Sequence, residues 1–155
     1  MNVEDKLVNI LINKGYHVAF VESCTGGLAV ARIVNVANAS KVLNCSFIAY
    51  SNDAKINLVN VNPDTLDQYG AVSEEVVREM ASGVAKAAKA EIGVGISGVA
   101  GPSGGSKEKP IGMVCFGIQI NNINYTFTEY FQSQSRNEIR NSSVEFILNK
   151  LLELI

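Results

Sequence analysis

The stretch that decides the fold is His17–Gly27, with the sequence HVAFVESCTGG. Its apolar run Val18–Val21 predicts a buried strand, which stops at Glu22–Ser23. The two glycines that close the stretch predict a turn into an apolar helix over residues 28–37. A strand, small polar residues and a glycine-opened helix together present one side chain at the mouth of a parallel-type sheet, beside unpaired helix N–H groups. In this sequence that side chain belongs to Ser23.

A serine in this position has two interpretations. Ser23 can be the N-cap of the helix that follows, or it can be a nucleophile. Cys24 is a second candidate nucleophile, because a thiol next to a helix N-terminus can be activated. The single histidine, His17, lies at the opposite end of the strand from Ser23, about 20 Å away at ~3.3 Å per residue. A Ser–His–Asp triad is therefore not expected.

Length and composition favour one α/β domain over residues 1–155. The chain is too short for two ordinary domains, and its residues are 47% apolar with few aromatics and no tryptophan. A net charge of −2 offers no basic face for nucleic acid. The apolar runs are too short to span a membrane, and the N-terminal residues lack the pattern of a signal peptide. We expect a cytoplasmic protein that binds neither nucleic acid nor membrane.

The cysteines predict no metal site and no disulfide. Cys24, Cys45 and Cys115 form an odd set without CxxC spacing, and His17 alone cannot complete a zinc site with them. Cys45 and Cys115 are expected to be buried thiols that fill small spaces in the core. No cofactor is expected.

Hydrophobic periodicity and turn residues place the remaining elements. Asn121-Asn122 separates two β-rich runs and predicts a hairpin, so the sheet is expected to be mixed, in a layered fold with helices flanking the sheet. Residues 62–64 are interpreted as a break in the chain, and residues 67–70 as a turn. The other predicted helices cover residues 3–14, 54–59, 74–89 and 135–155, and the other predicted strands cover residues 46–50, 92–97, 111–120 and 123–130.

Lys55 is a candidate general base. Asp53 can cap a short helix over residues 54–59, which places Lys55 in its first turn. The positive end of the helix and partial burial both destabilise an ammonium group there and lower its pKa. The alternative is an ordinary lysine charge in solvent.

A glycine-rich segment, Gly98–Gly105, follows the predicted strand over residues 92–97. It contains neither GxxxxGK[ST] nor GxGxxG, so it is not a recognised phosphate loop. It is either a flexible connector or a ligand-binding loop, because open α/β sheets bind ligands where strands end. Lys107 and Lys109 could then meet an anionic group. Arg136 and Arg140, one helical turn apart, are either solvated or able to address a phosphate jointly.

Three motifs carry a resemblance to a known family. ESCTGG (22–27), FIAYSNDAK (47–55) and GISGVAGPSGGSKEKPIG (95–112), in this order, resemble the C-terminal domain family of the competence-damage-inducible protein CinA. The stand-alone members of that family are nicotinamide-nucleotide amidases, and the resemblance covers nearly the whole chain. It implies a Ser–Tyr–Lys amidase, in which Ser23 attacks a carboxamide while the Lys55–Tyr50 pair manages the proton.

The resemblance also implies a set of residues around the substrate. Backbone N–H groups around Thr25–Gly27 are the candidates for an oxyanion hole. The candidate catalytic residues are Ser23, Tyr50 and Lys55. The candidate substrate-binding residues are Thr25, Gly26, Gly27, Ser97, Gly98, Gly101, Gly104, Gly105, Lys107, Lys109, Arg136 and Arg140.

The implied reaction is deamidation of nicotinamide mononucleotide to nicotinate mononucleotide and ammonia, in pyridine-nucleotide salvage. Two other hypotheses stay open: a non-catalytic nucleotide-binding module related to competence or the DNA-damage response, and a hydrolase of another small amide or ester. The expected partner is a small-molecule nucleotide, and a homo-oligomer is possible.

Overall fold

The computed structural model of the chain describes all 155 residues, and its elements are built around one five-stranded sheet. In chain order the elements are α1 (Val3–Lys14), β1 (Val18–Glu22), α2 (Leu28–Val34), a short 3₁₀ turn (Ala39–Lys41), β2 (Phe47–Ile48), α3 (Asn52–Val59), α4 (Pro63–Tyr69), α5 (Glu74–Ala88), β3 (Ile92–Gly98), β4 (Met113–Ile120), β5 (Ile123–Tyr130) and α6 (Arg136–Leu154).

The sheet is mixed, as the sequence predicts. Its strand order is β2-β1-β3-β4-β5. The strands β2, β1 and β3 run parallel, whereas β4 and β5 are antiparallel to their neighbours. Asn121 and Asn122 make the tight turn between β4 and β5, and both have the positive φ angles that such a hairpin turn requires. The predicted class, a layered α/β fold, is confirmed.

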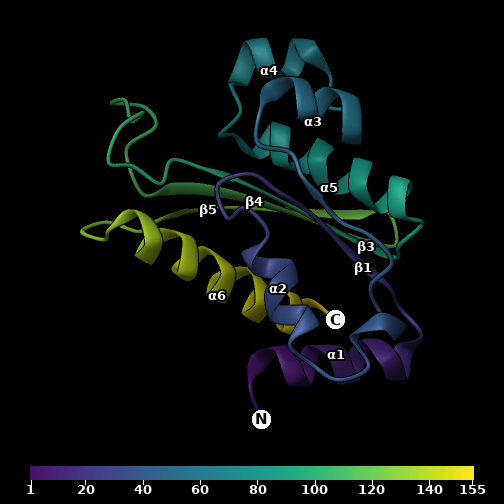
Figure 1. The fold of residues 1–155 in the computed structure, drawn as a ribbon. Helices are drawn as coiled ribbons and strands as arrows, with labels where there is room; N and C mark the ends of the chain where they lie inside the picture. Colours follow the sequence, from purple (N-terminus) through teal and green to yellow (C-terminus); the bar gives the residue numbers. More distant parts are fainter.

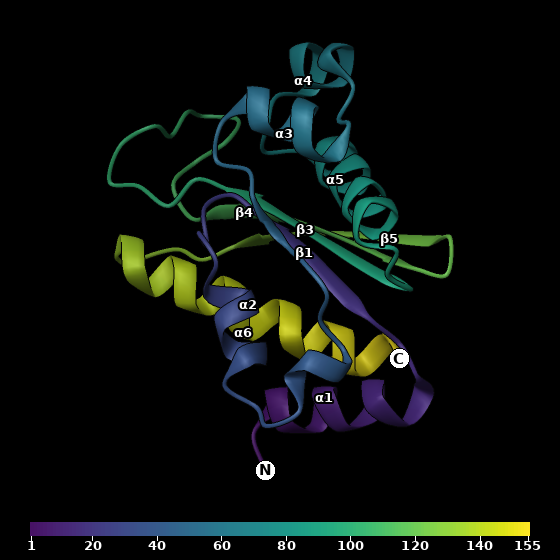
Figure 2. The same cartoon turned by 45° about the vertical axis from the view of Figure 1, so that its right-hand side comes forward.

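Helices cover both faces of the sheet. Helices α3, α4 and α5 lie on one face, and α1, α2 and α6 lie on the other (Figures 1 and 2). Helix α5 approaches the strands closely because glycines lie beneath it: a Cβ at Gly93 would overlap the carbonyl oxygen of Ala81, and one at Gly117 would overlap that of Val77. At these two positions the backbone of α5 therefore packs directly against the strands. None of the helices has the length and apolar character that crossing a bilayer needs.

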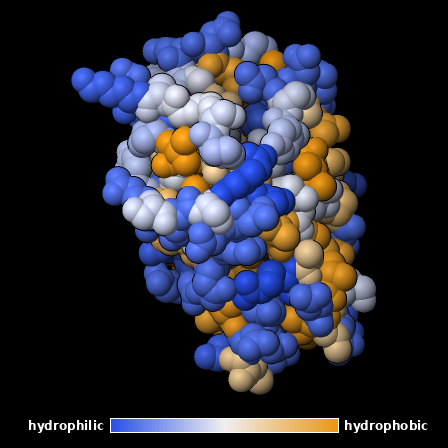
Figure 3. Space-filling model, turned by 60° about the vertical axis from the view of Figure 1, so that its left-hand side comes forward, coloured by the Kyte–Doolittle hydropathy of each residue, from blue (hydrophilic) through white to orange (hydrophobic).

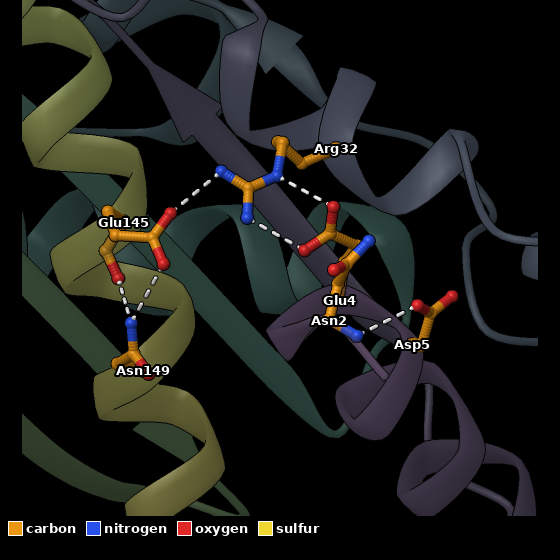
Figure 4. Close-up of polar contacts among 6 residues, drawn as sticks. All are labelled: Asn2, Glu4, Asp5, Arg32, Glu145 and Asn149. Carbon is orange, nitrogen blue, oxygen red and sulfur yellow. Dashed lines mark hydrogen bonds and ion pairs between the residues drawn. The ribbon is translucent and has the colours of Figure 1, made fainter.

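On the opposite face, a charged cluster joins three helices (Figure 4). Arg32 of α2 donates hydrogen bonds from Nε and Nη2 to the carboxylate of Glu4 in α1, at 3.0 and 2.7 Å, and from Nη1 to Glu145 in α6, at 3.0 Å. The guanidinium lowers the pKa of the Glu4 carboxyl group, although burial opposes that shift. The helix that follows Ser23 is therefore held at its far end by both terminal helices.

Several boundaries differ from the predictions. The helix expected over residues 28–37 ends at Val34, and the strand expected over residues 46–50 is only Phe47–Ile48. The strand expected to start at Ile111 starts at Met113. The break and turn expected within residues 62–70 are in fact helix α4: Asn62 caps it through its side chain, and Pro63 occupies the first turn, where its missing N–H costs nothing.

The cysteines also divide differently. Cys24 and Cys115 are buried, but Cys45 is exposed, so the prediction of a buried Cys45 thiol was wrong. Cys45 belongs to the connection after the 3₁₀ turn, outside any helix or strand, where no packed layer covers it.

Candidate active site

The candidate site lies at the carboxyl ends of the three parallel strands. Ser23 follows β1 directly, Tyr50 comes two residues after β2, and Ser97 ends the buried part of β3. The backbone N–H of Ser23 donates to the carbonyl of Ile96, which fixes the two strand ends to each other. A cavity of about 320 Å³ opens between them, at the edge where open α/β sheets bind ligands. It is lined by Ser23, Cys24, Tyr50, Asn52, Lys55, Ala71, Val72, Ser97, Gly98, Val99, Ala100, Gly101, Ser103, Gly104 and Arg136.

Ser23 and Lys55 meet in this cavity. The Nζ atom of Lys55 lies 3.2 Å from the Oγ atom of Ser23 and donates a second, longer hydrogen bond of 3.4 Å to the backbone carbonyl of Tyr50. Ser23 is 9% exposed and Lys55 only 1%. Helix α3 carries Lys55 inward, and the cap of this helix is Ser51, whose side chain accepts from the N–H of Ala54. The cap predicted at Asp53 was therefore wrong.

The environment of Lys55 favours its neutral form. Burial lowers the pKa of the Lys55 amine below the ordinary lysine range, because the charged form loses its hydration. No carboxylate lies within ion-pair distance of Lys55 to oppose this shift. A neutral amine beside a serine hydroxyl can accept the hydroxyl proton, so the geometry and the pKa together suit a Ser–Lys pair.

Glu22 has a structural role that the sequence reading missed. Its side chain is completely buried, and its carboxylate accepts hydrogen bonds from the backbone N–H groups of Gly27, Ala29 and Val30, at 3.0 to 3.2 Å. These groups belong to the start of α2, where a negative charge is favoured. The helix N–H groups expected to be unpaired are therefore occupied. In the sequence, the one feature that could have predicted this is the glutamate at the end of β1.

Two backbone N–H groups remain next to the nucleophile candidate. Gly26 donates to the carbonyl of Ser23, and Gly27 donates to Glu22, so neither is free to bind an oxyanion. The N–H groups of Cys24 and Thr25 have no hydrogen-bond partner within the protein. Of the predicted oxyanion donors, the Thr25 N–H stays available, those of Gly26 and Gly27 do not, and the Cys24 N–H joins it.

Tyr50 and Arg136 also line the cavity. The Tyr50 hydroxyl accepts a hydrogen bond from Nη2 of Arg136 at 3.0 Å, and Nη1 of Arg136 donates to the carbonyl of Gly101 at 2.6 Å. Tyr50 contacts Lys55 through its backbone carbonyl only. The predicted Tyr–Lys pair requires a bond between the Tyr50 hydroxyl and Lys55. In the structure the hydroxyl bonds neither Lys55 nor Ser23.

Some of the predicted substrate-binding residues line the cavity, and the others lie outside its lining. Ser97, Gly98, Gly101, Gly104 and Arg136 line the cavity.

The other predicted substrate-binding residues do not line the cavity. The Lys109 amine donates to the carbonyl of Tyr69 in α4, and Lys107 is exposed and does not line the cavity. Arg140 binds the carbonyls of Cys24 and Thr25. The remaining predicted residues outside the cavity lining are Thr25, Gly26, Gly27 and Gly105. The one-turn spacing of Arg136 and Arg140 was compatible with two solvated arginines or a joint phosphate site, but only Arg136 lines the cavity.

Cys24 does not suit the part of a nucleophile. It is buried, and this burial raises the pKa of its thiol to about 11. A thiol with that pKa stays protonated at neutral pH, and the thiol form is a poor nucleophile. Ser23, with a lysine amine 3.2 Å away, is the better candidate.

The face of the molecule from which the glycine-rich loop projects is mostly hydrophilic, and its hydrophobic residues gather in separate groups and along one edge (Figure 3). A polar surround of this kind suits a polar or charged small molecule rather than an extended apolar ligand.

A buried serine and lysine at the carboxyl edge of a mixed sheet define the chain as an α/β protein with a Ser–Lys site. The model of the CinA C-terminal domain matches residues 1–155, and the chain belongs to that family.

Curated relatives support this assignment. The chain is 46% identical over 149 residues to a CinA-like protein of Kosmotoga olearia, with 96% of the chain covered. It is 44% identical over 151 residues to a putative competence-damage inducible protein of Alkaliphilus oremlandii, with 97% covered. The chain spans only 36% of the length of either relative.

Solved structures match over nearly their full length. The competence damage-inducible protein A of Klebsiella pneumoniae superposes with a TM-score of 0.94 at 31% identity, covering 98% of this chain and 94% of the other. A competence or damage-inducible protein of Enterobacter asburiae superposes with a TM-score of 0.94 at 34% identity, covering 97% and 94%.

Proposed function

We propose that the protein is an amidohydrolase that converts nicotinamide mononucleotide to nicotinate mononucleotide and ammonia. The observation that carries the proposal is the 3.2 Å separation between the Lys55 amine and the Ser23 hydroxyl inside the cavity. The three motifs shared with nicotinamide-nucleotide amidases support the choice of substrate. Arg136, a guanidinium in the cavity wall, supports a substrate that carries a phosphate.

The reaction begins with attack by Ser23. Its Oγ forms a bond to the carboxamide carbon, its proton passes to the neutral amine of Lys55, and the electron pair of the C=O double bond moves onto the oxygen. Lys55 then returns the proton to the departing nitrogen, the C–N bond breaks, and ammonia leaves. Water attacks the resulting ester with Lys55 as its base, which releases the carboxylate and restores Ser23.

The N–H groups of Cys24 and Thr25 supply the donors for the oxyanion in this scheme. Each donor of this kind contributes about 3 kcal/mol to the stability of a tetrahedral intermediate in other acyl transfers. The Tyr50 hydroxyl and Arg136 then bind the substrate, rather than moving the proton. A proton-transfer role for Tyr50 stays a prediction. It would require the Tyr50 hydroxyl to leave Arg136 when the substrate binds.

The decisive experiment is an ammonia-release assay with nicotinamide mononucleotide, run with the wild-type chain, Ser23→Ala and Cys24→Ala. We expect Ser23→Ala to lower kcat by about 10⁴-fold or more, because the covalent step is lost. Cys24→Ala is expected to keep most of the activity. Binding of the nucleotide without turnover would favour the binding-module hypothesis, and turnover only of phosphate-free amides would favour another small substrate. Loss of activity in Cys24→Ala with retention in Ser23→Ala would overturn the nucleophile assignment.

A further inference from the structure

Arg140 occupies an unexpected place for a residue on the same helix face as Arg136. Its Nε donates to the carbonyl of Cys24 at 2.9 Å, and its Nη2 donates to the carbonyl of Thr25 at 3.3 Å. Its Nη1 donates to Asn137 at 3.1 Å. A guanidinium whose three nitrogens already have partners is poorly placed to serve as a phosphate ligand. Its contacts instead join α6 to the turn immediately after Ser23.

The bond to the Cys24 carbonyl fixes the direction of a neighbouring N–H. In a trans peptide the C=O and the following N–H point to opposite sides. With the Cys24 carbonyl held against Arg140, the N–H of Thr25 points away from Arg140. That N–H is one of the two next to Ser23 that lack a partner. The peptide therefore presents a donor, not an acceptor, on the side opposite α6.

The Gly26 N–H closes the turn by donating to the Ser23 carbonyl, but apart from Arg140 nothing makes a hydrogen bond to the C=O or N–H of the Cys24–Thr25 peptide itself. The Thr25 hydroxyl is buried but makes no hydrogen bond, so the threonine side chain does not hold the turn. Gly26 follows at a positive φ of 58°, and a Cβ there would lie only 3.3 Å from Nη2 of Arg140. The peptide between Thr25 and Gly26 borders this glycine, and its carbonyl accepts from the Leu28 N–H and from Arg140. Arg140 is the one side chain that makes hydrogen bonds to the backbone of Cys24 and Thr25.

We propose that Arg140 is a positioning residue for the oxyanion hole, holding the Cys24–Thr25 peptide so that its N–H, together with that of Cys24, receives the oxyanion that forms when Ser23 attacks. This inference rests on the proposed acyl-transfer reaction. Without Arg140 the C=O and N–H of this peptide have no hydrogen-bond partner, and a carbonyl oxygen turned toward the oxyanion would repel it. Arg140 then acts on the transition state and contributes nothing to recognition of a phosphate.

The test compares Arg140→Met on nicotinamide mononucleotide and on its phosphate-free counterpart, nicotinamide riboside. Because an oxyanion donor acts only in the transition state, we expect kcat to fall about 100-fold with both substrates and KM to change less than about threefold. Arg140→Lys keeps the charge but not the fork that reaches two carbonyls, so we expect an intermediate loss of about 10-fold in kcat. Arg78→Met is the matched control, since Arg78 is exposed on α5 and makes no side-chain hydrogen bond, and it should behave as wild type.

A second readout does not need the nucleotide. The rate at which p-nitrophenyl acetate acetylates Ser23, followed by mass spectrometry, depends on the oxyanion hole but not on substrate recognition. Arg140→Met should slow it by a factor similar to the loss in kcat. If Arg140→Met does not fold by circular dichroism, Arg140→Lys carries both measurements.

The outcomes separate this inference from the proposed function. A rise in KM confined to the phosphorylated substrate, with kcat and acetylation unchanged, would make Arg140 a phosphate ligand and overturn the inference while the function stands. A wild-type chain that releases no ammonia, but whose Ser23 acetylation is slowed by Arg140→Met, would overturn the function and support the inference. A wild-type Ser23 that reacts with neither nicotinamide mononucleotide nor p-nitrophenyl acetate would overturn both the proposed function and the inference.

Discussion

The two loops that border the cavity are built in opposite ways. The nucleophile loop, residues 22–27, is buried from Glu22 to Thr25, and its backbone is held by the Glu22 carboxylate on one side and by Arg140 on the other. The glycine-rich loop, residues 98–110, is exposed from residue 102 to residue 108. Within it Ser106 and Lys109 bond each other, and its bonds to the helices are those from Arg136 to the Gly101 carbonyl and from the Lys109 amine to the Tyr69 carbonyl.

This contrast suggests a division of labour between the loops. Reacting groups must be held to within a fraction of an ångström, which a buried loop supported by side chains on both sides provides. An exposed loop can adapt to a substrate, but it cannot hold a reacting atom with the same accuracy. Changes in the buried loop and its supports should therefore lower kcat, whereas changes around the exposed loop should raise KM.

After Ser23→Ala, the largest effect is expected from Lys55→Arg, which changes the base that serves the nucleophile loop. A guanidinium cannot give up its proton in the working range of pH, so we expect kcat to fall by about 10³-fold or more. In the wild type, kcat/KM should rise with pH and level off below the ordinary lysine pKa near 10.4, because the neutral amine is the active form and burial lowers its pKa. pH profiles of turnover for Lys55→Arg and for the wild type measure the fall in kcat and the rise of kcat/KM with pH. Near-normal turnover in Lys55→Arg would show that Lys55 supplies only charge.

The next effect tests the support behind the nucleophile. Glu22→Gln keeps the shape but replaces one acceptor oxygen with an NH₂ group, which faces the start of α2 without a partner. We expect the free energy of unfolding to fall by about 2 kcal/mol, and kcat to fall about 10-fold because Ser23 shifts with its loop. Denaturant titration and steady-state kinetics report the two quantities. A stable variant with reduced affinity and unchanged kcat would contradict the division of labour.

A smaller effect is expected from Arg136→Met, on the side of the glycine-rich loop. Loss of a charge-assisted contact to a phosphate should raise KM for nicotinamide mononucleotide about 10-fold and leave kcat nearly unchanged. Nicotinamide riboside, which has no phosphate, should show little change in KM. If KM rose equally for both substrates, Arg136 would be holding the loop through Gly101 rather than binding phosphate.

The smallest effect is expected from Lys107→Ala. Lys107 is exposed and does not line the cavity, so both kinetic constants should stay within about twofold of the wild type, as for most surface substitutions. A strong rise in KM would mean that the glycine-rich loop closes over the substrate and brings Lys107 into the site.

The sequence predicts the fold better than it predicts the site. Periodicity places the helix Val3–Lys14 at the observed bounds, and the Asn121-Asn122 hairpin and the mixed sheet follow from local turn chemistry. Helix α4 was missed because Pro63 was read as a break, although proline is well tolerated in the first turn of a helix.

Within the site, the structure pairs the predicted residues Ser23 and Lys55, because strand ends and helix starts are readable in sequence. The partners of backbone groups are not readable in the same way. Glu22 reaches N–H groups five to eight residues ahead, and Arg140 reaches carbonyls more than a hundred residues back. Such contacts depend on how α2 and α6 pack, so spacing alone could not separate the roles of Arg136 and Arg140.

The burial of Lys55 also has a consequence for the stability of the whole protein. The amine loses its hydration on folding and gains no carboxylate in exchange, so the unfolded chain binds the proton more tightly than the folded one. The contribution of Lys55 to stability is therefore highest above the ordinary lysine pKa, declines as the pH falls towards the lowered pKa of the folded state, and is lost below it. At neutral pH the residue weakens the fold in which it works. Unfolding titrations of the wild type and Lys55→Met at pH 7 should find the inactive variant to be the more stable protein.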